Sequence, residues 1–580
     1  MKSLFIPKES YQNGLKLNTS WQGNSATFKL INTSKSEVAI NDVCLLTAKM
    51  MFSPDTPVYG EGFNMLSQYG GTVKESYLIG SFSDYSHYKL PKPEGINQVY
   101  NMAIFYPKDK KPLLVGFSSC HRFTGKIRFN EEKIELLIDG EGIKIGAGEE
   151  IPLEEIFIIE GERNEILNAF ADQITKNHKR NAFPEIPTGW CSWLVYGPDI
   201  TAKNIYDNLD AIKEKCLDLK YIQIDDGYQR HWGDWFDFTD KFEGGVKKVC
   251  LDIKKKGFEP AIWVAPFVAD KDSNLFKNHP DWFVKDENGA PLDSSTVTFG
   301  GWRCAPWYIL DTTHPKALEY VKTVFKTMHN DWKINYFKLD AIVWAALPFG
   351  TRYDKTKTSV EAFKMGMQAI NESAGNSFIL GGNSPMWPAI GMVNGMRVTN
   401  DNQRGFYQFK QIGIECFNRS WQHNKLWIND PDTVLLQNQR VSVVGPDGKE
   451  AIKEGSVTND EFLFNAVYTM ASGGMVLSGD DISSLTDENV TLLKKLLPPV
   501  NVQAEFDDTT FTVGRAKISE NKEILYVFNF EDTEKDILVK VDKSIKATDV
   551  FSGEKIDTSL GKIEFSGFKP HSARAIILEH

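Results

Sequence analysis

The most constraining feature of this sequence is a long stretch in which short apolar runs alternate with amphipathic helices. Between the runs, apolar residues recur at helical spacing, as at Ile205, Leu209 and Ile212. Such alternation predicts a parallel β/α architecture, and eight strands is the number that closes a (β/α)8 TIM barrel. The eight runs are Gly189–Tyr196, Leu219–Asp225, Pro260–Phe267, Asn335–Ile342, Phe378–Gly382, Met396–Thr399, Leu426–Asn429 and Gly474–Ser478.

The sequence on both sides of this stretch has a β-like pattern. Short β-branched segments such as Ile134–Ile138 are separated by turn residues, and Pro184 and Pro187 mark the point where the pattern changes. We therefore expect an N-terminal β-sandwich domain over residues 1–183, a catalytic barrel over 184–498 and a small all-β, sandwich-like C-terminal domain over 499–580. Residues 578–580 resemble the remnant of an affinity-tag linker.

Composition excludes several classes of function. The 580 residues carry 66 Lys and Arg against 77 Asp and Glu, a net charge of −11, which argues against nucleic-acid or anionic-membrane binding. No apolar run has the length of a membrane span, and the start has no signal-peptide core. Seven widely spaced Cys without a C-x-x-C predict neither disulfides nor zinc, and the 10 His lack metal-ligand spacing. We expect a cytoplasmic protein without metal or cofactor.

Carboxylates gather at the ends of the predicted strands, where a barrel carries its catalytic groups. Asp side chains stand at five of the eight ends, and Trp residues stand between them. Any single Asp is readily explained as a capping or turn residue, and any single Trp as core. Together they suit a sugar pocket, because aromatic rings stack on a polyol and carboxylates accept its hydroxyl protons. The residues concerned are Trp193, Asp225, Asp226, Trp263, Asp340, Asp401, Asp430, Asp432, Asp480 and Asp481.

Residue parity places a cation beside each of two carboxylates. Lys338 and Asp340 share one side of a strand, as do Arg397 and Asp401. A neighbouring cation favours ionised Asp340, which suits a nucleophile, and the charge of Asp340 would make Asp401 a better acid. Paired carboxylates in unequal environments are the requirement for glycoside hydrolysis.

At these residues the sequence resembles glycoside hydrolase family 36, the α-galactosidase (melibiase) family of clan D, in its shorter bacterial and archaeal form. The resemblance is spread over most of the predicted barrel and includes its strand-end motifs. These motifs are Gly189–Trp193, Ile224–Tyr228, Gly233–Trp235, Ile262–Phe267, Tyr336–Asp340, Phe378–Gly381 with Ser384 and Pro385, Gly395–Asp401 and Trp427–Asp432.

The resemblance implies a retaining, exo-acting α-galactoside hydrolase without a cofactor. Asp340 would be the nucleophile and Asp401 the acid/base. Asp225 and Asp226 would take the C4 and C6 hydroxyls. Lys338 and Arg397 would bind hydroxyls and orient the carboxylates, while Trp193 and Trp263 wall the pocket. The partner would be a small carbohydrate, and a homo-oligomer is left open.

The sequence departs from the family pattern at two places. Leu194 replaces an aromatic residue, and Gly382 stands where relatives commonly place a Cys near the sugar C2 substituent. Loss of that side chain would make room for a C2 N-acetyl group, with Asn383 as its amide partner, and would predict an α-N-acetylgalactosaminidase. A tight glycine turn without functional meaning explains Gly382 equally well.

Two further readings stay open. One is an α-galactosyl transferase, as in the plant raffinose synthases. The other is a non-catalytic sugar-binding protein, which the presence of both Asp340 and Asp401 disfavours.

Overall fold

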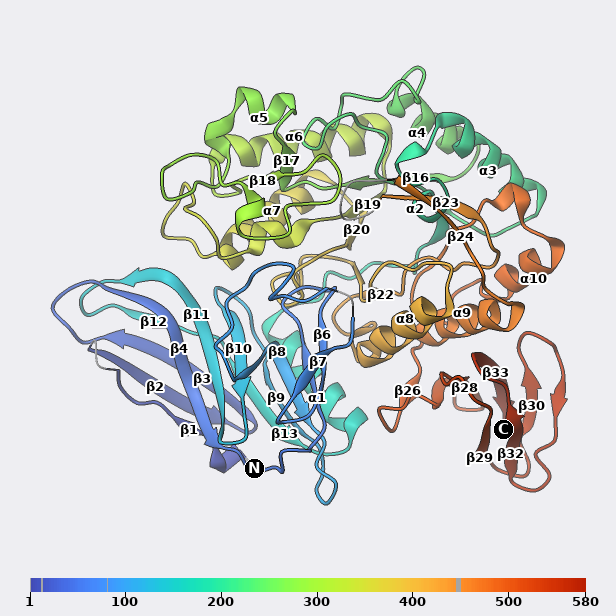
Figure 1. Cartoon of the computed structure of the whole chain (residues 1–580), viewed down its shortest axis with the longest axis horizontal. Helices are drawn as coiled ribbons and strands as arrows, with labels where there is room; N and C mark the ends of the chain where they lie inside the picture. Colours follow the sequence, from blue (N-terminus) through green and yellow to red (C-terminus); the bar gives the residue numbers. More distant parts are fainter. Residues whose placement is uncertain (1, 12–13, 81, 445–449) are drawn as a thin grey trace.

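The computed structural model describes residues 2–11, 14–80, 82–444 and 450–580, and its centre is a barrel of parallel strands (Figure 1). The strands are hydrogen-bonded in the order β22-β21-β20-β19-β16-β15-β14-β25. The amide of Met475 donates to the carbonyl of Asn429 at 3.0 Å across the remaining gap, so the ring is nearly closed. The predicted (β/α)8 barrel is confirmed. Its strands are β14 (Thr188–Cys191), β15 (Tyr221–Ile224), β16 (Glu259–Val264), β19 (Tyr336–Leu339), β20 (Phe378–Gly381), β21 (Gly395–Arg397), β22 (Ile428–Asp430) and β25 (Val476–Ser478).

Amphipathic helices surround these strands. In α7 the predicted apolar face is buried, and Thr358 and Glu361 form a capping box at its start. Among the described residues, no helix combines the length and apolarity needed to cross a membrane. The helices are α2 (Trp193–Tyr196), α3 (Ala202–Glu214), α4 (Val246–Lys255), α5 (Asn274–Asn278), α6 (Pro315–Trp332), α7 (Ser359–Ser373), α8 (Phe406–Asn418), α9 (Asn459–Ser472) and α10 (Asp487–Lys495). Two antiparallel strand pairs accompany them, β17 (Val268–Asp270) with β18 (Trp307–Ile309) and β23 (Arg440–Val444) with β24 (Glu450–Glu454).

Six of the eight predicted strands end earlier than expected, by one to five residues, and the first and the fourth show why. The first stops at Cys191, and Trp193–Tyr196 forms the short helix α2. The fourth stops at Leu339, because Ala341 adopts a left-handed conformation with φ of 52° and turns the chain. In both cases an apolar run continues past the strand into a buried turn, so periodicity alone did not show where the strand ends.

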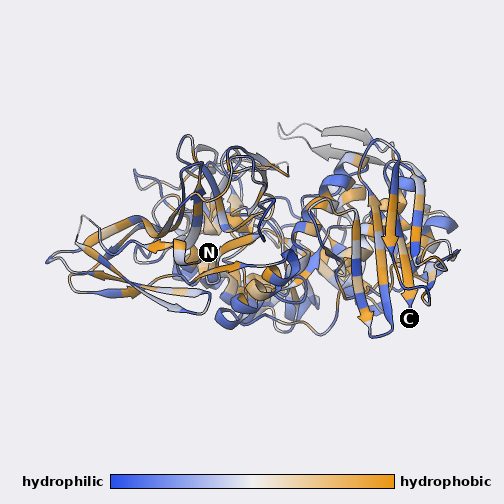
Figure 2. Cartoon of the chain, turned by 90° about the horizontal axis from the view of Figure 1, so that it is seen from below, coloured by the Kyte–Doolittle hydropathy of each residue, from blue (hydrophilic) through white to orange (hydrophobic). Residues whose placement is uncertain are grey.

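The N-terminal region is an antiparallel sheet of thirteen strands (Figure 2). Its strands alternate in burial; in β3, for example, Ala26, Phe28 and Leu30 are buried whereas Thr27 and Lys29 are exposed. The strands are β1 (Ile6–Pro7), β2 (Leu15–Gln22), β3 (Ser25–Asn32), β4 (Val38–Lys49), β5 (Val58–Glu61), β6 (Gln68–Gly71), β7 (Ser76–Leu78), β8 (Asn97–Phe105), β9 (Leu113–Phe117), β10 (Thr124–Phe129), β11 (Lys133–Ile145), β12 (Glu150–Pro152) and β13 (Ile156–Glu160). Helix α1 (Arg163–Asn177) packs on β9 and β13 before the chain enters the barrel.

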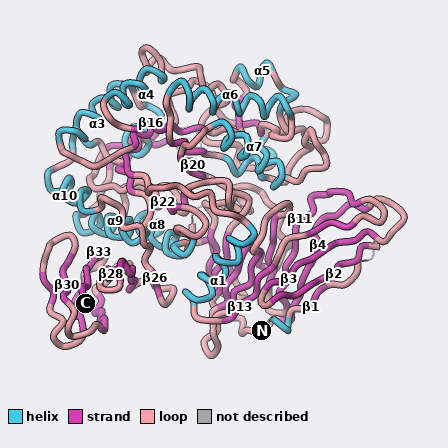
Figure 3. Tube along the Cα trace, turned by 180° about the vertical axis from the view of Figure 1, so that it is seen from behind, coloured by secondary structure: helices cyan, strands magenta, loops and turns pink. Residues whose placement is uncertain are grey.

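The C-terminal region is all β, as predicted. A six-stranded sheet contacts α9 through β33, so α9 lies between the barrel and this sheet (Figure 3). Strands β29 and β32 form a separate pair. The strands are β26 (Glu505–Phe506), β27 (Val513–Ser519), β28 (Lys522–Asn529), β29 (Lys535–Lys540), β30 (Lys546–Asp549), β31 (Lys555–Ile556), β32 (Lys562–Phe568) and β33 (Ser572–Glu579).

A buried ion pair joins the N-terminal sheet to the barrel. Arg419, which directly follows α8, and Glu61, at the end of β5, are both 0% exposed, with 2.7 Å between Nη2 and Oε2. Arg419 also donates to the carbonyls of Met65, Ser67 and Val398. Every arm of the guanidinium thus has an acceptor, which offsets the large cost of burying the charge.

We predict that Arg419→Met lowers the free energy of unfolding by about 3–5 kcal/mol, because it leaves the Glu61 carboxylate buried without its cation. Urea denaturation measures this. The exposed pair Lys29–Glu150 supplies the control, since Lys29→Met removes a salt bridge of 2.7 Å that solvent screens and costs at most about 1 kcal/mol. Equal losses in the two variants would contradict the prediction.

Candidate active site

Asp225 and Asp226 follow β15 directly and are almost fully buried. Asp225 accepts hydrogen bonds from Lys338 Nζ at 2.9 Å and from Gln223 Nε2 at 2.7 Å, and its amide donates to Ser192 Oγ. Lys338 stands on β19, so this ion pair crosses the inside of the barrel. Asp225 raises the pKa of Lys338 in spite of the amine's burial. The ammonium therefore stays charged and fixes the Asp225 carboxylate.

Asp226 is held by an arginine that sequence reasoning missed. Arg303 donates to both carboxylate oxygens of Asp226, with Nε at 3.0 Å and Nη2 at 2.5 Å, and Gln229 adds a third bond at 2.6 Å. Arg303 lies between β17 and β18, outside the barrel strands. A buried carboxylate requires a cation, but nothing in the sequence singles out this one, which is 77 residues away.

Asp340 directly follows β19 and is partly exposed. Its carboxylate accepts hydrogen bonds from Trp263 Nε1 at 3.0 Å and from the amide of Ala341 at 2.7 Å. Desolvation is the main cause that raises its pKa, and the charge of Asp401 raises it further. Lys338 lowers it, as the sequence predicts, but its ammonium bonds to Asp225 and the net direction is upward. The predicted influence of Lys338 on Asp340 is therefore present, but desolvation outweighs it.

Asp401 lies in the loop that follows β21, with its side chain 56% exposed. Arg397 Nη2 donates to its Oδ1 at 2.9 Å, so the predicted neighbours do meet. The predicted shared strand face was wrong, because β21 ends at Arg397 and Asp401 lies in the loop. The two central carboxylates lie in different environments, since Asp340 is desolvated and Asp401 is open to solvent.

The remaining predicted residues stand at neighbouring strand ends. Trp263 is buried and bonds to Asp340, while Trp193 is partly exposed and opens α2. Gly382 follows β20, and a Cβ built there would lie 3.9 Å from the Asp340 carboxylate. Asn383, with a positive φ of 40°, accepts a hydrogen bond of 2.6 Å from the hydroxyl of Tyr88.

Tyr88 is the second residue that the sequence did not reveal. It belongs to the N-terminal region, is fully buried, and reaches Asn383 across 295 positions of sequence. The charge of Asp340 contributes to its raised pKa, so its hydroxyl lies near the candidate nucleophile. The N-terminal region thus contributes directly to the site.

Two further carboxylates lie at and just beyond the end of β22, close to Arg397. Asp430 and Asp432 are buried and act electrostatically on Arg397. Burial raises the pKa of Asp430 to about 6 although Arg397 opposes it. Among the described residues, no group of three or more His, Cys, Asp and Glu is arranged to hold a metal ion.

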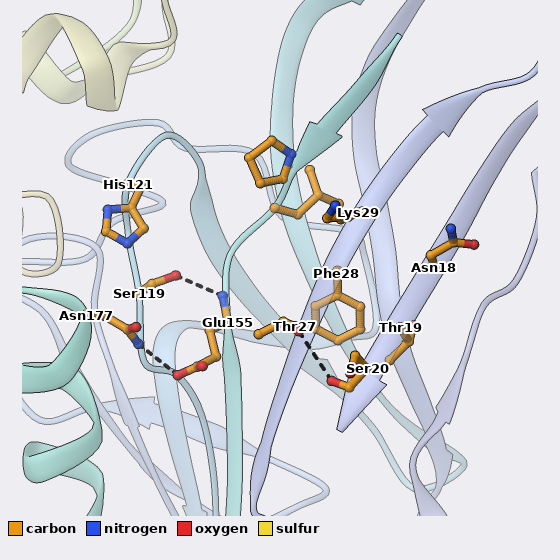
Figure 4. Close-up of a pocket in the computed structure, with 12 residues that line it drawn as sticks. Asn18, Thr19, Ser20, Thr27, Phe28, Lys29, Ser119, His121, Glu155 and Asn177 are labelled. Carbon is orange, nitrogen blue, oxygen red and sulfur yellow. Dashed lines mark hydrogen bonds between the residues drawn. The ribbon is translucent and has the colours of Figure 1, made fainter. Parts of the chain in front are cut away.

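A cavity of about 360 Å³ lies elsewhere, in the N-terminal sheet (Figure 4). Ser119, His121, Glu155 and Asn177 line one side of it, and none of the predicted site residues does. The Glu155 carboxylate is already bonded by Gln173 and Asn177 at 2.8 Å each. We therefore place the candidate site at the barrel ends and not in this cavity.

Comparison with known proteins finds similarity that includes much of the barrel. The family model Melibiase matches residues 166–378, which include Asp225, Asp226 and Asp340. The predicted resemblance to the melibiases is confirmed. The matched segment ends before Asp401.

Curated relatives match only part of this chain, and only part of their own length is matched. The "Alpha-galactosidase Mel36A" of Lactobacillus acidophilus is 22% identical over 48% of this chain and 37% of its own length. The "A type blood alpha-D-galactosamine galactosaminidase" of Flavonifractor plautii is 25% identical over 41% of this chain and 23% of its own length. The chain thus spans well under two thirds of these relatives.

The fold extends further than the sequence similarity. The alpha-galactosidase TtGalA of Thermus thermophilus, solved in complex with p-nitrophenyl alpha-D-galactopyranoside, superposes with a TM-score of 0.65 at 20% identity. The match covers 87% of this chain and 98% of the Thermus chain. The three-region architecture is therefore shared with a solved alpha-galactosidase.

We predict a pH-dependent effect of Asp430→Asn on stability. Because the folded pKa of Asp430 is raised to about 6, its burial becomes costly as pH rises above about 3, below which it is protonated in both the folded and the unfolded state. The unfolding free energy of the variant relative to wild type should therefore rise by up to about 3 kcal/mol between about pH 3 and pH 7. Urea denaturation across this range measures it, and a difference that does not change with pH would contradict the assignment.

Proposed function

We propose that this chain is a retaining glycoside hydrolase that removes terminal α-linked galactose from small carbohydrates. The observation that carries the proposal is the pair formed by Asp340 and Asp401. Asp340 is desolvated and held by two N–H donors, whereas Asp401 is open to solvent and held by Arg397. A carboxylate held between fixed N–H donors can act as the nucleophile, and a carboxyl group open to solvent can exchange protons with the departing oxygen and with water.

The reaction follows from these positions. The Asp340 carboxylate attacks the anomeric carbon while the glycosidic C–O bond breaks, and the Asp401 carboxyl gives its proton to the departing oxygen. The product of this step is a glycosyl ester of Asp340. Asp401, now ionised, takes a proton from water; the water oxygen attacks the anomeric carbon, and the ester bond to Asp340 breaks. Two inversions leave the sugar with its original α configuration.

Sugar recognition is assigned to the charged groups around the nucleophile. Asp225 and Asp226 offer acceptors for the C4 and C6 hydroxyls, and their cations Lys338 and Arg303 fix the carboxylates in one orientation. An axial C4 hydroxyl can reach such an acceptor where an equatorial one cannot, which selects galactose over glucose. The name and the bound nitrophenyl galactoside of the Thermus relative support this substrate class.

We predict that Asp340→Gly lowers kcat/KM for 4-nitrophenyl α-galactoside by at least about 1,000-fold, because the covalent step loses its nucleophile. Azide should restore turnover by attacking from the vacated side, and the product should be β-galactosyl azide, identified by NMR. Asp549→Asn, at a buried Asp of the C-terminal sheet, should keep full activity. Retained activity in Asp340→Gly would refute the proposed nucleophile.

A second candidate substrate is an α-linked N-acetylgalactosamine. Gly382 leaves the space beside Asp340 without a side chain, and the Asn383 side-chain oxygen is already taken by Tyr88. The side-chain nitrogen of Asn383 makes no hydrogen bond within the described part of the chain. This nitrogen is not sealed off inside the protein either. It is thus free to donate to an acetamido carbonyl. The name of the Flavonifractor relative points to a 2-amino sugar.

We predict that Gly382→Cys lowers the ratio of kcat/KM for 4-nitrophenyl α-N-acetylgalactosaminide to that for the α-galactoside by about tenfold or more. The added side chain would fill the space that the acetamido group needs, and such steric terms are worth about 1–3 kcal/mol. Parallel assays of both substrates measure the ratio. An unchanged ratio, or a wild type that cleaves only the galactoside, would exclude this second substrate.

A further inference from the structure

Asp432 is a buried carboxylate for which the proposed reaction has no role. It lies two residues beyond β22, is 7% exposed, and has a φ of 71°. A left-handed conformation costs a non-glycine residue roughly 1–2 kcal/mol, although Asp and Asn tolerate it best. Such local strain persists where surrounding contacts over-determine it, and it is concentrated at functional sites.

The contacts that hold Asp432 lead to Asp401. Its Oδ2 accepts a hydrogen bond of 2.6 Å from the backbone amide of Asn402, the residue directly after Asp401. The same oxygen lies 3.2 Å from Arg397 Nη2, the atom that also donates to Asp401. Asp432 therefore holds both the chain next to the candidate acid/base and the cation that orients it.

The two loops are joined by further bonds that do not involve Asp401. Asn402 Nδ2 donates to the carbonyl of Thr433 at 3.0 Å and to the hydroxyl of Tyr468 at 2.8 Å. The other oxygen of Asp432 accepts from the amide of Thr433 at 2.7 Å, which fixes the carboxylate's own rotamer. The loop after β21 thus rests on the loop after β22.

The charges also fit such a role. Arg397 lies between Asp401 and Asp432, and both carboxylates raise its pKa. Desolvation and the charge of Asp401 raise the pKa of Asp432, while Arg397 lowers it. Arg397 is thus shared by a solvent-exposed and a buried carboxylate, at 2.9 and 3.2 Å.

We propose that Asp432 is the positioning residue for Asp401: through the amide of Asn402 and through Arg397, it keeps the Asp401 carboxyl where it can protonate the glycosidic oxygen. This inference rests on the proposed function, because it assumes that Asp401 is the acid/base. Both oxygens of the buried Asp432 carboxylate accept backbone amides, which suits a residue that positions and does not react.

The test compares two substrates whose leaving groups differ in how strongly they depend on protonation by a general acid. Asp432→Asn keeps the shape and tolerates the positive φ but removes the charge. Asp432→Gly removes the side chain and relieves the backbone. Both should lower kcat/KM for melibiose, whose sugar leaving group needs a proton, by about 10- to 100-fold, and for 4-nitrophenyl α-galactoside by no more than about fivefold.

The same variants give a second, independent readout. If Asp401 is misplaced, it also fails to activate water, so the glycosyl ester accumulates and both kcat and KM for the nitrophenyl substrate fall together. Azide, which needs no general base, should then raise kcat in the Asp432 variants and not in wild type. A residue that only stabilised the fold would change neither the leaving-group dependence nor the response to azide.

Asp549→Asn is the matched control. Asp549 is likewise buried, accepts backbone amides at 2.8 and 2.9 Å and pairs with Arg574 at 3.1 Å, but it stands in the C-terminal sheet. It should lose no leaving-group-dependent activity. Equal losses on the two substrates in both Asp432 variants, or no effect of azide, would overturn the positioning role. A wild type that cleaves neither substrate, nor the corresponding N-acetylgalactosaminides, would instead overturn the proposed function.

Discussion

Arg419 stands at the junction on which the rest of the structure depends. Its guanidinium is buried against Glu61 of the N-terminal sheet and donates to the carbonyl of Val398, the residue after β21. Asp401 follows Val398 by three positions. The same arginine therefore joins the N-terminal sheet to the barrel and supports the start of the loop that carries Asp401. The guanidinium of Arg419 can be buried at tolerable cost only when all its donors have acceptors, and these acceptors come from both regions. The N-terminal sheet and the barrel therefore have to pack in one relative position. That relative position also brings Tyr88 to Asn383.

Charge pairing at the barrel ends sets Asp340 apart from the carboxylates around it. Asp225, Asp226, Asp401 and Asp480 each have a cation within 2.9 Å, namely Lys338, Arg303, Arg397 and Arg404. Within the described ranges, Asp340 has no salt bridge and is held only by the indole N–H of Trp263 and one amide. A carboxylate held by neutral donors keeps more of its nucleophilic character than one that is locked to a cation. The environment that raises the pKa of Asp340 is therefore consistent with covalent chemistry.

The sequence was enough to predict the barrel and the strand-end residues, because both follow from local patterns. Apolar runs bounded by glycine, proline and charge reveal a strand, and a barrel places its site where those strands end. Arg303 and Tyr88 could not be found in this way, because their partners lie 77 and 295 residues away and neither belongs to a barrel strand. The bonds of Lys338 were also beyond reach, since parity gives the side on which a side chain stands but not the carboxylate that it meets. The role that we propose for Asp432 depends on a backbone amide, which has no signature in the sequence.

The central claim, that Asp340 forms the covalent intermediate, is tested most directly by trapping that intermediate. An activated 2-deoxy-2-fluoro galactosyl donor forms the ester but hydrolyses it slowly, since the fluorine destabilises the oxocarbenium-like transition state. After incubation and proteolysis, the account predicts a peptide that contains Asp340 and carries one fluorosugar, identified by tandem mass spectrometry, and no label in Asp340→Gly. A label on any other carboxylate, or turnover of the donor to the β product with no ester formed, would contradict it.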